Sequence, residues 1–192
     1  MKKIVQKEDK ALRKKTKEIP LPEIKNPKIK KILKEMGGAL RSQSDGVAIA
    51  APQIGYSLSI FLVSGKVLEA GFPERGLSQD GGLRGSARLA SRDSDPAQEN
   101  SAVRDLIFIN PKISKLSRAK EWTPEGCLSV RWLYGKTYRS KKATVTAYDE
   151  NGKKFTRGAS GLLAQIFQHE TDHLNGILFI DHAKDIKEEL PK

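Results

Sequence analysis

Residues 168–176 read QHETDHLNG, and the pattern H-E-x-x-H within them constrains this chain more than any other feature. On a helix, residues four apart share one face, so His169 and His173 can offer two imidazoles to a single metal ion. Glu170 lies between them, where it can act as a general base on a water at that metal. Apolar residues at helical spacing over 161–167, and the Asn-Gly stop signal after the motif, predict the helix itself.

The chain also supplies a third donor of the kind that such a metal needs. Two of its three histidines fall in the motif, and its one cysteine, Cys127, stands in the stretch EGCLS over residues 125–129. Taken separately, the histidines could be hydrogen-bonded core groups and the cysteine a small buried apolar residue. Together, Cys127, His169 and His173 form a donor set for a catalytic divalent metal with a fourth position left for water. A thiolate donor favours iron or zinc over magnesium or calcium.

Length and composition indicate one globular domain spanning 1–192. A chain of 192 residues can bury a core without disulfides, and with one cysteine it can form no intrachain disulfide. No run of 18 apolar residues occurs, so we expect no membrane span. The N-terminal residues are charged and lack the apolar segment of a secretory signal, which favours the cytoplasm.

The charge balance is strongly basic. Lysine and arginine number 35 against 23 acidic residues, a net charge of +12, with clusters at 28–34 and 139–142. This balance favours a polyanionic neighbour, most simply ribosomal or other RNA. A solvated surface that only keeps the chain soluble is the alternative, and the sequence leaves both open.

The secondary-structure pattern predicts an α+β domain. Asn26-Pro27 marks a helix start, and the helix should run to about residue 42. Five further segments are predicted to be strands: 58–63, 105–109, 112–116, 143–148 and 153–156. The last two of these should form a hairpin. Residues 65–102, rich in Gly, Ser, Arg, Asp and Gln, are expected to be a flexible insertion outside the catalytic core.

Three stretches together resemble the three motifs of peptide deformylases: GVAIAAPQIG at 46–55, EGCLS at 125–129 and QHETDH at 168–173. Their order and spacing match that family outside the insertion. The resemblance implies mixed or antiparallel sheets around a central HExxH helix. It implies hydrolysis of the N-formyl group from the formylmethionine of a nascent polypeptide, releasing formate. Iron(II) would be the native metal, with zinc or nickel able to occupy the site.

The resemblance also assigns roles to residues. Cys127, His169 and His173 would be the ligands, and Glu170 the general base that later protonates the leaving amine. Gln53 and the backbone N–H of Leu128 would form the oxyanion hole, although Gln53 could instead be an amide that caps its loop. The expected substrate-binding residues are these: Val47, Ala48, Leu162, Gln165 and Arg139.

The predictions about substrate binding depend on weaker evidence than those about the metal ligands. An extended peptide could add as a strand along residues 47–49. Leu162 is expected to belong to the core whatever the function. Arg139 would either contact the substrate backbone or be a surface charge.

The chain departs from the family pattern at several places. Ala48 replaces a glycine, and Arg131-Trp132 stands where a proline is usual. We expect the family's extended C-terminal helix to be largely absent. Ala48 should slow the enzyme, through a positive φ or by crowding the substrate. The alternative is an ordinary strand position with its methyl group in the core.

Two other functions remain to be weighed. A zinc peptidase would need a third ligand, but Phe179 stands where one peptidase pattern has histidine, and only Glu188 and Glu189 could serve the other. Both peptidase patterns leave Cys127 unexplained. A divergent deformylase-like protein without activity, acting as a ribosome- or RNA-associated module, is the alternative from a different class.

Overall fold

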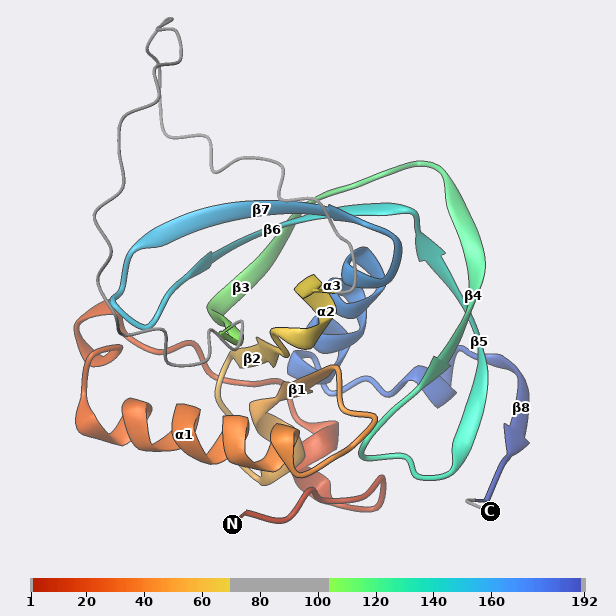
Figure 1. The fold of residues 1–192 in the computed structure, drawn as a ribbon, viewed down its shortest axis with the longest axis horizontal. Helices are drawn as coiled ribbons and strands as arrows, with labels where there is room; N and C mark the ends of the chain where they lie inside the picture. Colours follow the sequence, from red (N-terminus) through yellow and green to blue (C-terminus); the bar gives the residue numbers. More distant parts are fainter. Residues whose placement is uncertain (1, 70–103, 191–192) are drawn as a thin grey trace, which may run out of the picture.

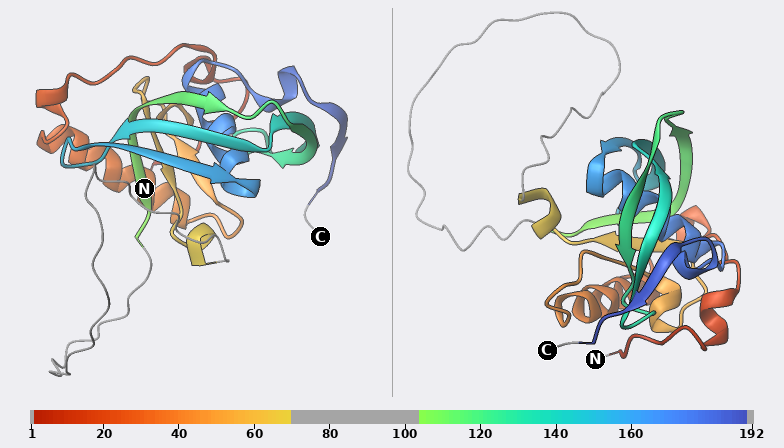
Figure 2. Two further views of the ribbon diagram at one scale, coloured as in Figure 1. Left: turned by 90° about the horizontal axis from the view of Figure 1, so that it is seen from above. Right: turned by 90° about the vertical axis from the view of Figure 1, so that its right-hand side faces the viewer.

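Two antiparallel sheets form the body of the molecule (Figures 1 and 2). The computed structural model describes residues 2–69 and 104–190. The five-stranded sheet has the order β1 (Ala48–Ala50), β2 (Ile60–Val63), β3 (Leu106–Leu116), β6 (Lys142–Tyr148), β7 (Lys154–Ser160). The three-stranded sheet has the order β4 (Lys120–Gly126), β5 (Leu133–Ser140), β8 (Lys184–Glu188). Among the described residues, β1 and β4 are therefore edge strands, each with one side free of a strand partner within its sheet.

The helix that carries the H-E-x-x-H pattern, α3 (Gly161–Leu174), lies between the two sheets (Figure 1). Its Phe167 packs on a pair of stacked phenylalanines from the five-stranded sheet, Phe61 and Phe108, whose ring centroids are 4.5 Å apart. Small residues of β1, Ala48 and Ala50, belong to the same core cluster. This apolar contact fixes the face of α3 that carries the histidines relative to β1.

The opposite face of the five-stranded sheet is covered by α1 (Pro27–Arg41), which begins with proline at its first turn as expected. Alternate residues of β2 belong to different cores: Ile60 and Leu62 pack with α1, whereas Phe61 and Val63 pack on the α3 side. Burial on both faces explains why this strand reads as a continuous apolar run. The remaining short helices are η1 (Lys10–Arg13), η2 (Leu21–Glu23), η3 (Ala51–Ile54), α2 (Lys66–Glu69) and η4 (Phe179–Asp181).

The α+β class and the central C-terminal helix are confirmed, while the strand boundaries need correction. The segments expected as two strands, 105–109 and 112–116, form the single strand β3. The pairing of β3 with β6 has two register shifts, between Ile109 and Lys112 and between Ile113 and Lys115. The first includes Asn110, which has a φ of 49° and whose side chain bonds both the N–H and the C=O of Ile19. A side chain that replaces a backbone partner in this way leaves no signal in the apolar pattern. β4, β5 and β8 were not predicted individually.

The expected insertion at 65–102 lies outside the described residues from position 70 onward. Its first residues do not fit the expectation, because Val67 of α2 is 4% exposed and packs in the α3-side core. Gly65 N–H also donates to Asp105 Oδ1 at 3.2 Å. The packed core therefore continues past the expected boundary at 65. Among the helices of the described residues, none is long and apolar enough to cross a membrane.

Candidate metal centre and substrate cavity

The three predicted donors come together in space. α3 places His169 and His173 one turn apart, with ring centroids 4.8 Å from each other. Cys127 follows β4, and its Sγ lies 3.2 Å from His173 Nε2. One donor atom from each of the three residues lies within 4.8 Å of the others. A thiol and two imidazoles at this separation fit one divalent ion of the iron or zinc type.

The first histidine is oriented by a buried carboxylate. Glu125 of β4 has its Oε1 2.7 Å from His169 Nδ1, which leaves Nε2 of that ring for the metal. Burial would raise the pKa of Glu125, but the hydrogen bonds with His169 and Arg139 outweigh burial and hold that pKa well below its usual range. At His169, burial lowers the pKa, whereas the hydrogen bonds with Cys127 and Glu125 raise it. The net result is a pKa well above the ordinary value for histidine. Carboxylates of this kind fix the tautomer and ring orientation of metal-binding histidines.

Arg139 takes neither of the roles expected of it. Its side chain is buried, at 7% exposure, and does not line the cavity. Its guanidinium donates to both oxygens of Glu125, at 2.7 and 3.0 Å, and to Asp172 at 2.6 Å. Burial lowers the pKa of Arg139 and these carboxylates raise it, with a net upward shift. It is therefore neither a surface charge nor positioned to contact substrate, because its donors face the carboxylates that surround the metal centre.

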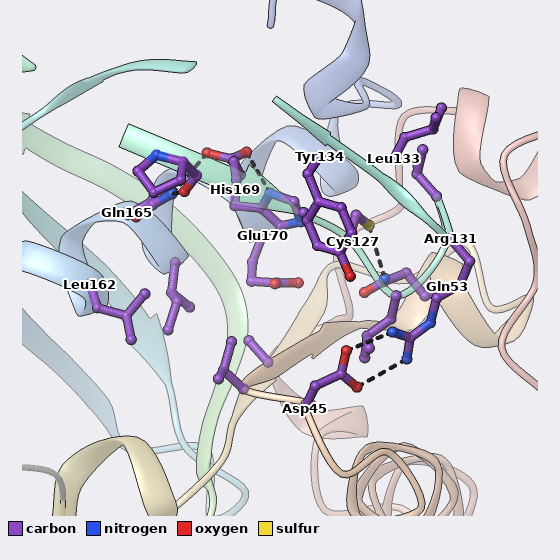
Figure 3. Close-up of a pocket in the computed structure, with 18 residues that line it drawn as sticks. Asp45, Gln53, Cys127, Arg131, Leu133, Tyr134, Leu162, Gln165, His169 and Glu170 are labelled. Carbon is purple, nitrogen blue, oxygen red and sulfur yellow. Dashed lines mark hydrogen bonds and ion pairs between the residues drawn. The ribbon is translucent and has the colours of Figure 1, made fainter. Parts of the chain in front are cut away.

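Glu170 is suited to proton transfer by its surroundings. It is 3% exposed and lines the cavity, and its Oε2 has no hydrogen-bond partner among the described residues (Figure 3). Burial, helped by the charges of Glu125 and Asp172, raises its pKa to about 7 despite His169. Burial lowers the pKa of His173 well below its ordinary value, which favours the neutral ring that binds metals.

Gln53 is pointed at the cysteine by its own turn. Its Oε1 accepts from the N–H of Ala50 at 2.8 Å, so the oxygen end closes the turn of η3. Its Nε2 lies 3.6 Å from Cys127 Sγ and 3.2 Å from Ser129 Oγ. The loop-capping and the donor interpretations therefore describe two ends of one amide. Leu128 also lines this cavity, and its C=O accepts from the side chain of Gln6 at 3.2 Å.

A cavity of about 350 Å³ lies beside the donors, between the edge of β1, the edge of β4 and α3. Val47 and Leu162 form part of its wall at 41% and 42% exposure. Leu162 thus lies on the cavity wall, where it was expected as a substrate-binding residue, and not in the core, which was the other expectation for it. Gln165 also lines the cavity, with its amide held by the C=O of Pro124 at 2.8 Å.

Ala48 also lines the cavity, but its backbone does not have the positive φ that was considered for it. It belongs to strand β1, and among the described residues only Asn110 and Asp185 combine a side chain with a positive φ. Its methyl group is 5% exposed and packs in the α3-side core. The positive-φ explanation is therefore wrong, and the ordinary strand position describes this residue.

The sequence-based site omitted an ion pair on the cavity wall. Arg131 and Asp45 meet through two contacts, of 2.6 and 3.1 Å, and Arg131 also donates to Gln43 at 2.8 Å (Figure 3). Both charged residues line the cavity. The hydrogen bond from Arg131 lowers the pKa of Asp45 below its ordinary value. The available signal was the arginine that stands in place of the family's proline.

The site predicted from the sequence also lacked Tyr134, whose ring has room in the cavity wall because residue 126 is a glycine. A Cβ on Gly126 would lie 2.7 Å from the ring of Tyr134, too close for any side chain at that position unless the ring moved. Both residues line the cavity. The glycine before the cysteine thus allows an aromatic wall beside the metal donors (Figure 3).

A half-buried thiol, two histidines of an H-E-x-x-H helix and an adjacent carboxylate of raised pKa define the class of single-metal hydrolases. Comparison with known proteins narrows the class. The family model described as polypeptide deformylase matches residues 1–189. A peptide deformylase of Borreliella burgdorferi is 37% identical over 91% of this chain and 82% of its own length.

Two plant proteins extend the comparison. Peptide deformylase 1A, chloroplastic, of Solanum lycopersicum is 36% identical over 93% of this chain and 58% of its own. The crystal structure of Arabidopsis thaliana peptide deformylase 1B with an inhibitor superposes with a TM-score of 0.70 at 30% identity, covering 95% of this chain and 82% of that one. The chain belongs to the peptide deformylase family. It is a metal-dependent hydrolase of formyl-methionyl peptides, which decides against the peptidase and the inactive alternatives.

Proposed function

We propose that this chain deformylates nascent polypeptides with one divalent ion held by Cys127, His169 and His173. The observation that carries the proposal is that these three donors converge beside a cavity lined by Glu170, whose Oε2 has no hydrogen-bond partner among the described residues. When bound, the metal supplies Lewis acidity and lowers the pKa of water. The thiolate donor favours an ion such as iron or zinc over magnesium or calcium. We propose iron(II) as the native ion because the motifs resemble those of peptide deformylases, with zinc or nickel as substitutes.

Glu170 is the proton carrier in this proposal. A general base works best when its pKa lies near the operating pH, and burial places this one at about 7. Glu170 takes the proton of the attacking water and returns it to the leaving amine. The amide N–H of Gln53 and the backbone N–H of Leu128 donate to the oxygen of the formyl group as it becomes negative.

The peptide lies between two strand edges. β1 and β4 both present an edge to the cavity, so an extended peptide can hydrogen-bond to main chain and its sequence can vary. Val47, Ala48 and Leu162 supply apolar walls for the methionine side chain, and Gln165 lies beside them. The nascent formyl-methionyl peptide is therefore the proposed partner, and the cytoplasm the proposed compartment.

Two variants test the roles of the metal centre. Cys127→Ala should lose stoichiometric metal, measured by elemental analysis. Glu170→Gln should retain metal but release formate from formyl-Met-Ala-Ser about a hundredfold more slowly or worse, the usual scale for general acid–base catalysis. Glu121→Gln, at an exposed position of β4, is the control and should behave as wild type. Loss of metal in Glu170→Gln would show that the carboxylate is a ligand and not a base.

We also propose that the catalytic unit is one domain that does not need residues 70–102. β2 and β3 pair directly, from Val63 with Leu106 to Ile60 with Ile109, and so hold the two ends of this segment together. Replacing 70–102 with a short Gly/Ser bridge should therefore leave metal content and formate release unchanged, since loop closure depends weakly on length. An unfolded or metal-free product in circular dichroism and elemental analysis would contradict this.

The basic charge supports a further partner. A net charge of +12 favours contact with the ribosome, which is the polyanion nearest to a nascent chain. Cosedimentation with ribosomes at increasing salt tests this contact. Binding that persists unchanged at high salt would show that charge does not drive it.

A further inference from the structure

The outer face of the three-stranded sheet carries two exposed aromatic side chains next to each other. Trp122 of β4 pairs directly with Tyr138 of β5. Their side chains are 46% and 53% exposed, and their ring centroids lie 5.2 Å apart at an angle of 37°. Large aromatic groups are more often buried, so an exposed pair on a sheet indicates a contact surface.

Lysines surround this pair. Lys184 Nζ of β8 lies 5.0 Å from the centre of the Trp122 ring, and Lys120 Nζ lies 5.7 Å from that of Tyr138. Strand alternation places Lys136 on the same face, where it bonds Asp185 at 3.2 Å. We name these residues the aromatic face, and it carries three lysines against one carboxylate.

The aromatic pair lies outside the cavity, although Pro124, Gly126 and Tyr134 on the same side of β4 and β5 line it. The residues that alternate with the aromatic pair on β4 and β5 include Glu125, Thr137 and Arg139, which are all buried. Glu125 contacts His169, Arg139 donates to Asp172, and Thr137 donates to Glu125. Neither Trp122 nor Tyr138 lines the cavity. The catalytic role therefore does not explain why two aromatic rings are exposed here.

We propose that the aromatic face binds single-stranded RNA. Exposed rings on an open sheet can stack on unpaired bases of any sequence, while flanking lysines contact the phosphates. A duplex keeps its bases stacked inside and cannot use the rings. The choice of RNA rests on the function proposed above, because the nascent peptide that this chain would act on emerges from the ribosome, which is built largely of RNA.

Tryptophan fluorescence tests the stacking directly. Trp132→Phe leaves Trp122 as the only tryptophan, so its emission reports on this face alone. Titration with a single-stranded 12-nucleotide uridine RNA should quench that emission and give a saturable curve. A duplex of the same length should bind more weakly and leave the emission unchanged. Unchanged emission with the single strand would overturn the proposal.

Variants separate stacking from charge. The pair Trp122→Ala and Tyr138→Ala should weaken single-strand binding about tenfold or more, whereas Trp122→Phe with Tyr138→Phe should retain it. Lys120→Ala with Lys184→Ala should lower the dependence of log affinity on log salt by about 0.7 per lost phosphate contact. Lys30→Ala with Lys34→Ala, on exposed positions of α1, removes equal charge from another surface and should bind as wild type.

Each remaining outcome decides against the proposal. Equal losses from the α1 and β-sheet lysine pairs would show that net charge alone attracts RNA. Preferential binding to vesicles with anionic lipid, or a raised KM for longer formyl peptides in the double alanine variant, would assign the aromatic face to a membrane or to the substrate. Glu170→Gln should bind RNA as wild type, so a failure of the catalytic assignment is distinguishable from a failure of this one.

Discussion

Two arginines near the metal centre have carboxylate partners, and they differ in nearly everything else. Arg139 is buried and contacts Glu125 and Asp172 behind the histidines. Arg131 lies on the cavity wall and contacts Asp45, whose side chain is 53% exposed. The arginine considered for substrate binding thus supports the metal ligands, while the one noticed only as a departure from the family faces the cavity.

The difference shows how burial changes the consequence of an ion pair. A buried charge that loses its partner remains in a medium that solvates it poorly, so breaking the pair is costly. An exposed carboxylate that loses its partner is solvated by water, and surface pairs contribute little to stability. We therefore expect substitutions of Arg139 to change folding and metal binding, and substitutions of Arg131 to change substrate handling.

The largest effect is expected from Arg139→Met. Removing the guanidinium takes the arginine partner from the buried carboxylate of Glu125 and from the half-buried Asp172, at about 3–5 kcal/mol in the free energy of unfolding. Because Glu125 also orients His169, metal affinity should fall about 10- to 100-fold. Urea unfolding and competition with a chelator measure the two quantities.

Arg139→Lys is the conservative comparison for that experiment. Lysine keeps the charge but cannot make the two parallel bonds to Glu125, so its losses should be intermediate. If Arg139→Met had wild-type stability and metal affinity, the buried network would be unnecessary. The contrast with Arg131 would then disappear.

The contrast also marks where the sequence was informative. The ligands and Glu170 could be predicted because helical spacing fixes His169, Glu170 and His173 relative to each other, and one cysteine leaves no choice of thiol. The direction in which the Arg139 side chain points could not be predicted, because the alternation of β5 was not recognised in the sequence. Leu162 was expected both as a substrate-binding residue and as a core residue, and helical spacing could not decide between the two, because it defines a face of the helix but not where the neighbouring sheet ends.

Long-range pairs were beyond such reasoning. Asp45 and Arg131 are 86 positions apart, and Asn110 contacts Ile19 across 91. Side-chain contacts of this kind depend on how loops close, and apolar periodicity carries no information about loop closure. Charge, burial and motif spacing therefore recover the chemistry of the site but not the wall that surrounds it.

A smaller effect is expected from Arg131→Ala. The unfolding free energy should change by less than about 1 kcal/mol, as for exposed pairs. The variant should lose about three- to tenfold in kcat/KM for formyl-Met-Ala-Ser, mainly through KM, because the ion pair shapes the cavity and not the chemistry. Since the pKa of Asp45 is lowered, the pair stays ionised above the ordinary aspartate pKa, and the loss should not vary between about pH 5 and 8.

A double-mutant cycle decides whether the two residues act together. Asp45→Ala and Arg131→Ala, singly and combined, should give a combined loss in kcat/KM no greater than the larger single loss. Additive losses would mean that each residue contacts the substrate independently. A fall in stability as large as that of Arg139→Met would contradict the distinction drawn from burial.

The smallest effect is expected from Ala48→Gly, which also changes a residue of the cavity wall. Ala48 was expected to slow the enzyme, but its backbone has an ordinary strand conformation and its methyl group is packed in the core. Glycine here should lower stability by about 0.5–1 kcal/mol through added freedom of the unfolded chain. Formate release should stay within about twofold of wild type, since no strain is relieved that the reaction could use. Ala48 still lines the cavity, so a tenfold rise in kcat/KM with normal metal content would show that its methyl group crowds the peptide. In that case the methyl group of a neutral residue on β1 would restrict substrate binding more than the ion pair of Arg131 does. The shape of the cavity wall would then matter more for kcat/KM than its charge.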